Sequence, residues 1–140
     1  MSEPKKIFGY EIRAPFQGED DYFQKNKNVA GIATEDGRIT LNPYSGNTAE
    51  QQAAVAKNEA IRLWMRESNI DPKFKPTKEQ VQSFYGTEYA KPGNELQLRR
   101  TILARYLTGD GSAGNVTNRQ KVWGAFVMKG LMEREGGKKP

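Results

Sequence analysis

Apolar residues recur at helical spacing along three long stretches of the chain. Over residues 48–68, alanine, leucine and tryptophan return every three or four positions. This is the period of a helix that buries one face. Residues 94–109 and 117–131 follow the same period, and a shorter pattern covers residues 77–85. The pattern predicts four helices.

The same short motif stands at the start of three of these helices. Thr-x-x-Gln occurs at Thr48–Gln51, Thr77–Gln80 and Thr117–Gln120. In such a capping box the threonine hydroxyl accepts a hydrogen bond from the third helical amide, and the glutamine reaches back to the threonine N–H. The remaining helix is expected to begin after Asn94 and to end at Gly109.

Two runs rich in β-branched residues precede the helices. Val29–Thr34 and Arg38–Asn42 flank Glu35-Asp36-Gly37, and Asp-Gly between two such runs is typical of a tight hairpin turn. Pro43 follows the second run and ends it, because proline has no backbone donor. The predicted fold class is therefore α+β, mainly α, with about four helices and a short N-terminal β-hairpin.

The two ends of the chain differ from this centre. The pattern predicts an extended N-terminal arm over residues 1–28, a helical domain with the β-hairpin over residues 29–135, and a mobile basic tail over residues 136–140. Strand-like periodicity is weak even over residues 6–13. The alternative to an arm is an extension that packs on the protein's own core. Five aromatic residues of the arm are candidate partner-binding residues: Phe8, Tyr10, Phe16, Tyr22 and Phe23.

Composition argues against most catalytic chemistry. The chain has 140 residues and contains neither histidine nor cysteine. Disulfides and thiolate chemistry are thus excluded, and the serines lack a histidine base. We predict a protein that is not an enzyme and carries no cofactor. The sequence also lacks an apolar run long enough to span a bilayer, so we expect no membrane insertion.

Positive charge is concentrated in the second half. The net charge is +5 overall, with −2 over residues 1–50, +3 over residues 51–100 and +4 over residues 101–140. A basic half can attract nucleic acid, although an ordinary solvated surface has the same composition. Five residues are candidate nucleic-acid contacts: Arg99, Arg100, Arg105, Arg119 and Lys121.

One helical segment resembles a metallopeptidase core. Asn58-Glu59-Ala60-Ile61-Arg62 follows a strand and a short loop, and is similar to the zincin helix, in which His-Glu-x-x-His binds zinc and activates water. Asn58 and Arg62 stand at the ligand positions, and neither suits zinc. The resemblance implies a metal-free relic of a zincin-type peptidase. The alternative is a polar cluster on an ordinary helix, with Glu59 and Arg62 spaced for an ion pair.

A second resemblance covers most of residues 29–117. The segments 41–45, 58–62 and 107–114 resemble those of short proteins encoded by tailed bacteriophages. The resemblance implies a non-enzymatic virion structural or assembly protein of the head, connector or tail. Its partners would be other virion proteins or copies of itself in a homo-oligomer. It would be found in the virion, and in the host cytoplasm during assembly. A nucleic-acid-binding accessory or regulatory protein is the alternative.

Overall fold

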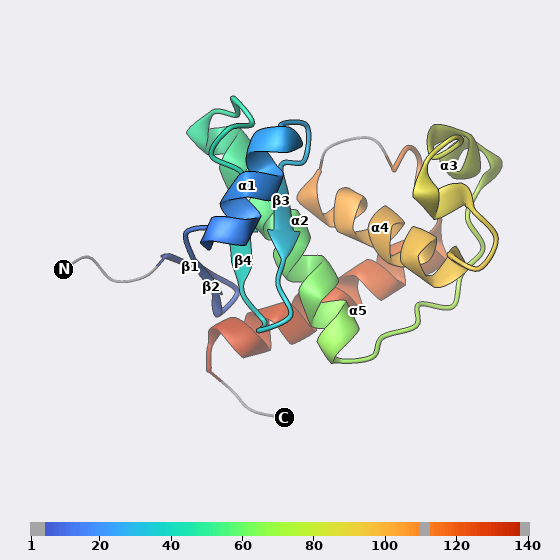
Figure 1. The fold of residues 1–140 in the computed structure, drawn as a ribbon. Helices are drawn as coiled ribbons and strands as arrows, with labels where there is room; N and C mark the ends of the chain where they lie inside the picture. The colour runs from blue at the N-terminus through green and yellow to red at the C-terminus, as the bar shows by residue number, and fades with distance from the viewer. Residues whose placement is uncertain (1–4, 110–112, 138–140) are drawn as a thin grey trace.

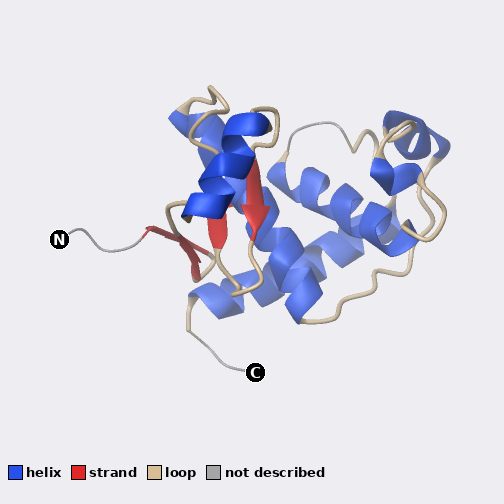
Figure 2. Cartoon of the chain, viewed as in Figure 1, coloured by secondary structure: helices blue, strands red, loops and turns tan. Residues whose placement is uncertain are grey.

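The computed structural model describes residues 5–109 and 113–137. The fold is α+β and mainly helical, as predicted, with a small sheet near the N-terminus (Figure 1, Figure 2). The described strands are β1 (Lys5–Ile7), β2 (Tyr10–Ile12), β3 (Gly31–Ala33) and β4 (Ile39–Leu41). The helices are α1 (Gln17–Lys25), α2 (Ala49–Glu67), α3 (Lys78–Ser83), α4 (Glu95–Thr108), α5 (Asn118–Glu135) and the short 3₁₀ helix η1 (Glu88–Ala90).

The four strands form one mixed sheet in the order β1-β2-β4-β3. β1 and β2 are antiparallel, and they are joined by a turn in which Phe8 and Gly9 have φ angles of 51° and 80°. Two positive φ angles in succession are typical of the tight turns that match strand twist. β2 runs parallel to β4, and β3 pairs antiparallel with β4 as the predicted hairpin. β3 therefore lies at one edge of the sheet.

The prediction of an extended arm is wrong for residues 5–28. These residues form β1, β2 and α1, and they pack on the rest of the chain. Tyr10 and Phe23 are completely buried, which provides the apolar contact that holds the segment in place. α1 was not predicted because Phe23 is its only buried residue. A helix with one buried side chain has no apolar stripe along its sequence.

The helix starts agree with the predicted motifs. Thr48, Thr77 and Thr117 each accept a hydrogen bond from the third helical amide. Gly109 has a φ of 74° and ends α4 in the left-handed conformation. Residues 138–140 of the predicted basic tail lie outside the described part of the chain.

α2 is the central element of the fold. It contacts β3 and β4 on one side and α4 and α5 on the other (Figure 1). Ile61, Leu63 and Met65 of α2 are buried in the same core as Ile102 and Leu131. This arrangement places the sheet and α4 on either side of one helix, and it creates the groove described next.

Candidate functional site: a groove beside the edge strand

Two adjoining hollows lie along the outer edge of β3. The first, of about 590 Å³, lies between β3, α2, η1 and α4. The second, of about 560 Å³, lies between β3, α2 and the C-terminal end of α4. Gly31, Glu59 and Arg62 line both hollows. Together they are termed the edge groove.

The backbone of β3 presents hydrogen-bonding groups to this groove. Thr34 N donates to Arg38 O at 2.8 Å, and Asn42 N donates to Ala30 O at 2.9 Å. Backbone groups of successive residues in a strand point to opposite sides. Residues 30, 32 and 34 therefore face β4, whereas Gly31 and Ala33 direct their N–H and C=O groups outward, into the groove.

Gly31 allows β3 to approach α2 closely. A Cβ atom at this position would lie 3.1 Å from Cγ1 of Val55 and 3.1 Å from the carbonyl oxygen of Thr40. Such distances are shorter than ordinary van der Waals contacts. The absence of a side chain on Gly31 thus keeps the edge strand next to the helix that carries Glu59 and Arg62.

Glu59 lies in the groove beside β3. Burial raises the pKa of its carboxyl above the ordinary range, and the nearby Arg62, Arg66 and the Ala33 N–H partly oppose this effect. The Glu59 carboxylate is therefore an acceptor for the outward-facing N–H of Ala33. No residue within 5–109 or 113–137 forms a hydrogen bond with the outward-facing N–H or C=O of Gly31, so the open pairing position on β3 is centred there.

Three arginines are held around the first hollow. Arg62 Nη2 donates to the hydroxyl of Tyr89 at 3.0 Å. Arg66 Nη2 donates to the backbone oxygen of Thr34 at 3.2 Å, and Arg100 Nε donates to that of Ile70 at 2.8 Å. Burial lowers the pKa of Arg100 from its usual value. These bonds use only part of each guanidinium, which has five N–H donors.

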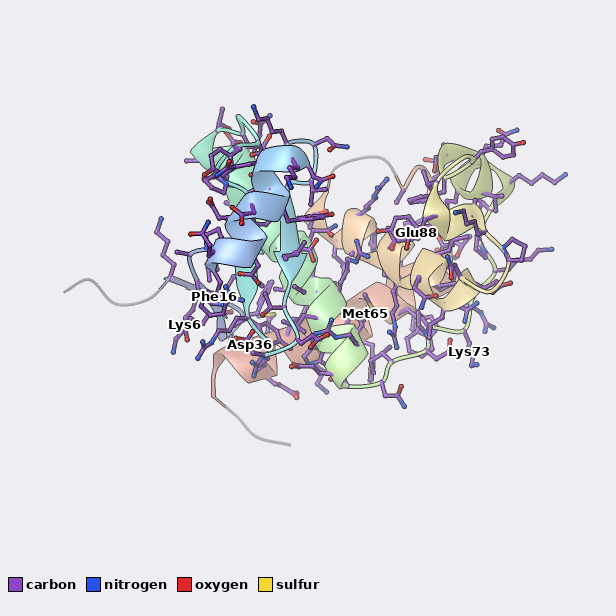
Figure 3. The ribbon with its side chains drawn as sticks, in the orientation of Figure 1. Lys6, Phe16, Asp36, Met65, Lys73 and Glu88 are labelled. Atoms are coloured by element: carbon purple, nitrogen blue, oxygen red, sulfur yellow. The ribbon has the colours of Figure 1, made fainter. Side chains whose placement is uncertain are left out.

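The charge of the groove is positive. Arg62, Arg66 and Arg100 line its first hollow together with Glu59 and Glu88. Glu88, labelled in Figure 3, lies on the η1–α4 side of the groove. Arg105 adds a further cation to the second hollow. The edge groove can therefore hold an elongated ligand that offers both backbone hydrogen bonds and negative charge.

The polar cluster predicted on α2 lies in this groove. Asn58, Glu59 and Arg62 all line it, and β4, the strand that precedes this helix in the sequence, packs beside α2. This is the placement that a zincin relic requires. Within the described residues, no group of three or more histidine, cysteine, aspartate or glutamate side chains could hold a metal ion. Descent from a zincin stays a prediction.

The aromatic residues predicted to bind a partner are divided by the fold. Tyr10 and Phe23 are buried in the protein's own core, so they cannot contact a partner in this fold, and that part of the prediction is wrong. Phe8 packs against the core. Phe16 and Tyr22 are exposed by 60% and 46%, and Tyr22 lies at the edge groove. The sequence pattern alone could not separate the two groups.

The predicted nucleic-acid contacts do not form one surface. Arg99 and Arg119 line a separate hollow of about 670 Å³ with Lys73, Lys75 and Phe74, here termed the basic hollow. Arg100 and Arg105 line the edge groove instead. Lys121 lies exposed on α5. The five residues are thus divided between the basic hollow, the edge groove and an exposed position on α5.

No protein-family model, curated protein or solved structure matches this chain. Among residues 5–109 and 113–137, none of the helices has the length and apolarity needed to cross a lipid bilayer.

Proposed function

We propose that this protein is a non-enzymatic structural or assembly protein of a bacteriophage virion, and that its edge groove binds an extended, acidic segment of a partner virion protein. The observation that supports the binding of such a segment is the outward-facing backbone of Gly31 beside the arginines of the edge groove. An extended segment can add to a sheet edge through main-chain hydrogen bonds, while neighbouring pockets select its side chains. The protein would act in the virion and, during assembly, in the host cytoplasm.

The charge balance of the groove favours an acidic segment. Arg62, Arg66 and Arg100 line its first hollow, against Glu59 and Glu88. The Glu59 carboxylate has the Ala33 N–H and two arginines as neighbours, so part of the positive charge is used internally. The remaining charge would be complemented by a segment that carries one or two carboxylates next to the residues whose backbone pairs with β3. Arginine binds a carboxylate through two parallel hydrogen bonds.

Peptide selection tests the groove directly. Random dodecapeptides displayed on a surface are selected on the immobilised full-length chain. We expect enrichment of extended sequences that contain Asp or Glu, and a loss of affinity of about tenfold or more in Arg62→Glu and Arg66→Glu. Arg119→Glu makes the same charge reversal outside the groove and should leave binding unchanged. Selected peptides without acidic residues, or equal binding to all variants, would refute the proposed groove.

The role in the particle needs its own measurement. Mass spectrometry of purified virions should detect the chain in a fixed ratio to the major capsid protein. Absence from mature particles, together with absence from assembly intermediates, would contradict the virion assignment while leaving the peptide-binding result intact.

A nucleic-acid accessory role is the second candidate, and the basic hollow favours it. Lys73, Lys75, Arg99 and Arg119 surround this hollow, with Phe74 among them. Asp71 forms ion pairs with Lys73 and Arg99, each at 2.8 Å, which neutralises part of the charge. Lys75 and Arg119 remain as the best phosphate contacts, because phosphate binding depends on such cations.

A salt titration distinguishes this candidate. Binding of a short DNA duplex should weaken steeply as the salt concentration rises. The slope of the logarithm of the binding constant against the logarithm of the salt concentration should become less steep by about one for each of Lys75→Ala and Arg119→Ala. Lys25→Ala, at the end of α1, is the control. No binding at low salt would exclude this role.

A further inference from the structure

Hydrogen bonds within the chain narrow the open part of the β3 edge to one residue. Val29 closes the side that precedes Gly31. Its N–H donates to Asn26 O at 3.0 Å, and its C=O accepts Nδ2 of Asn42 at 2.7 Å. Asn42 is completely buried, which fixes its amide against this carbonyl. An added strand therefore finds both backbone groups of Val29 already hydrogen-bonded.

Glu59 closes the side that follows Gly31. Its carboxylate is the acceptor for the N–H of Ala33, which is the next outward-facing donor of β3. Glu59 stands on α2, which packs against β3, so this acceptor belongs to the folded framework. Between Val29 and Ala33, only Gly31 offers an outward donor and acceptor that residues 5–109 and 113–137 leave unused.

A single open residue selects the direction of an added strand. In an antiparallel pair, two opposite residues exchange both of their N–H···O=C bonds, so one ligand residue can use both groups of Gly31. In a parallel pair, each residue bonds to two different residues of its neighbour. A parallel strand would need Gly31 together with the C=O of Val29 or the N–H of Ala33, and both of these already have partners. Antiparallel addition therefore forms two new backbone hydrogen bonds here, and parallel addition forms one.

The positive charge of the edge groove lies toward the C-terminal end of β3. Arg66 Nη2 donates to the backbone oxygen of Thr34, which directly follows β3. Arg66 and Arg100 line the first hollow and are absent from the lining of the second. Ala30, just before β3, lines the second hollow instead. The two hollows thus succeed each other along the strand, with the second at its N-terminal end.

The second hollow has a different chemical character. Its only arginine besides Arg62 is Arg105, whose guanidinium lies over the ring of Phe84 at 4.6 Å from the centroid. Most of the side chains that line this hollow are uncharged: Asn47, Gln51, Ala54, Val55, Asn58 and Thr108. A side chain that enters the second hollow is therefore best matched when it is small and uncharged.

We infer that the partner segment runs antiparallel to β3, with acidic side chains before, and small uncharged side chains after, the residue that pairs with Gly31. The inference rests on the proposed binding of an extended segment, to which it adds a direction and an order of side chains. In an antiparallel pair, the ligand residues that precede the paired one lie toward the C-terminal end of β3. They meet Arg66 and Arg100 there, and the residues that follow lie beside the second hollow.

Reversal of a selected peptide tests the order of the side chains. The tightest dodecapeptide from the selection on the full-length chain is synthesised, together with a peptide that has the same residues in reverse order. Composition and charge are then identical. We expect the reversed peptide to bind about tenfold more weakly or worse, as measured by calorimetric titration. It can place its acidic residues at the arginines or form both bonds with Gly31, but it cannot do both.

Disulfide cross-linking tests the direction itself. The chain contains no cysteine, so introduced cysteines are unique. Gln97→Cys places a thiol at the first hollow, and Ala54→Cys places one at the second. Under mild oxidation, the selected peptide with a cysteine at its N-terminus should react with Gln97→Cys. The peptide with a cysteine at its C-terminus should react with Ala54→Cys. Tyr85→Cys, at an exposed site that lines neither hollow, measures random collisions.

Two variants of Glu59 test why one direction is selected. Glu59→Ala frees the N–H of Ala33, so a parallel strand gains a second bond. The preference for the selected peptide over its reverse should shrink by about three- to tenfold. Glu59→Gln removes the same charge but keeps an oxygen that can accept this N–H, so the preference should stay that of the wild type. Equal changes in both variants would overturn the role given to this hydrogen bond.

The results separate this inference from the proposed function. Selection of no peptide, or of peptides that bind Arg62→Glu and Arg66→Glu as well as the wild type, would overturn both. Equal affinity for the selected peptide and its reverse would overturn the direction alone. So would the opposite disulfide pattern, in which the N-terminal cysteine reacts with Ala54→Cys and the C-terminal cysteine with Gln97→Cys. In these two cases the groove would still bind an extended acidic segment.

Discussion

Gln80 and Gln120 form a reciprocal pair of amide hydrogen bonds in the core. Gln80 Nε2 donates to Gln120 Oε1 at 2.8 Å, and Gln120 Nε2 donates to Gln80 Oε1 at 2.9 Å. Both side chains are buried. Each oxygen also accepts the backbone N–H of the threonine that caps its own helix, Thr77 or Thr117. The pair therefore joins the starts of α3 and α5, which lie forty residues apart in the sequence.

Removal of one glutamine of this pair should destabilise the protein strongly. Gln120→Ala leaves one N–H of the buried Gln80 amide without an acceptor, although Gln80 Nε2 still donates to Ala113 O and its Oε1 still accepts the Thr77 N–H. The change also removes the capping box of α5, and we expect a loss of about 2–3 kcal/mol in the free energy of unfolding. Gln51→Ala is the matched control, because Gln51 forms the same capping box on an exposed helix start. It should cost about 1 kcal/mol or less. Urea unfolding measures both, and equal losses would contradict the importance of the buried pair.

Asn42 should be essential for the attachment of α1. Its buried Nδ2 donates to Val29 O at 2.7 Å and to Asn26 O at 3.2 Å, and its Oδ1 accepts the N–H of Tyr44 at 2.8 Å. Asn42→Asp replaces the donor with a carboxylate oxygen that faces carbonyl oxygens. We expect a loss of about 3 kcal/mol at pH 7. Part of this loss should return in acid, where the protonated side chain can donate.

Asn115→Asp makes the same change in an exposed loop and should alter stability by about 0.5 kcal/mol at most. Thermal unfolding at pH 7 and pH 4 compares the two variants. A loss for Asn42→Asp no larger than that of Asn115→Asp would show that α1 does not depend on this side chain.

Gly130 should not tolerate a side chain. A Cβ atom at this position would overlap the indole ring of Trp64, so Gly130→Ala forces α5 away from α2. We expect a loss of about 1–3 kcal/mol in spite of the better helix propensity of alanine. Gly18→Ala, where α1 leaves open space, should be neutral or slightly stabilising. Trp64→Leu should reduce the cost of Gly130→Ala in a double-mutant cycle, and strict additivity of the two would argue against the contact.

Glu59 should make stability depend on pH. Burial raises the pKa of its carboxyl in the folded state, so the ionised form disfavours the folded state above that pKa, and the penalty disappears below the pKa of the unfolded chain. Glu59→Gln should therefore unfold at a higher temperature than the wild type at pH 7. The difference should shrink as the pH falls through the folded-state pKa of Glu59. Glu50→Gln, in the exposed first turn of α2, controls for the loss of one negative charge. An equal rise in the unfolding temperature of Glu50→Gln would show that the effect does not come from the burial of Glu59.

Local sequence signals were sufficient for the elements whose stability is local. The hairpin of β3 and β4 follows from two β-branched runs around Asp36-Gly37. The starts of α2, α3 and α5 follow from the Thr-x-x-Gln boxes, because a capping box is completed within four residues. The mainly helical α+β class follows from the same two patterns.

Other features depend on contacts between distant parts of the chain. α1 has one buried side chain, Phe23, and its C-terminal end is held by Asn42, so its position could not be recognised from residues 17–25 alone. The burial of Tyr10 likewise depends on α2, where the Tyr10 hydroxyl donates a hydrogen bond to Oε1 of Glu67 at 2.8 Å. An aromatic residue in a polar segment has the same local pattern whether it is buried or exposed.

The candidate site shows the same division. The sequence alone identified Asn58, Glu59 and Arg62 as a polar cluster on one helix, because helical spacing determines which residues share a face. Only the tertiary structure placed β3 beside that face and brought Arg100 to it from α4. Likewise, three Thr-x-x-Gln motifs are equivalent in the sequence. Only the tertiary structure brought the starts of α3 and α5 together, so that Gln80 and Gln120 are buried against each other whereas Gln51 is exposed. Local hydrogen bonds are encoded by neighbouring residues, whereas burial and pairing depend on which surfaces meet when the chain folds.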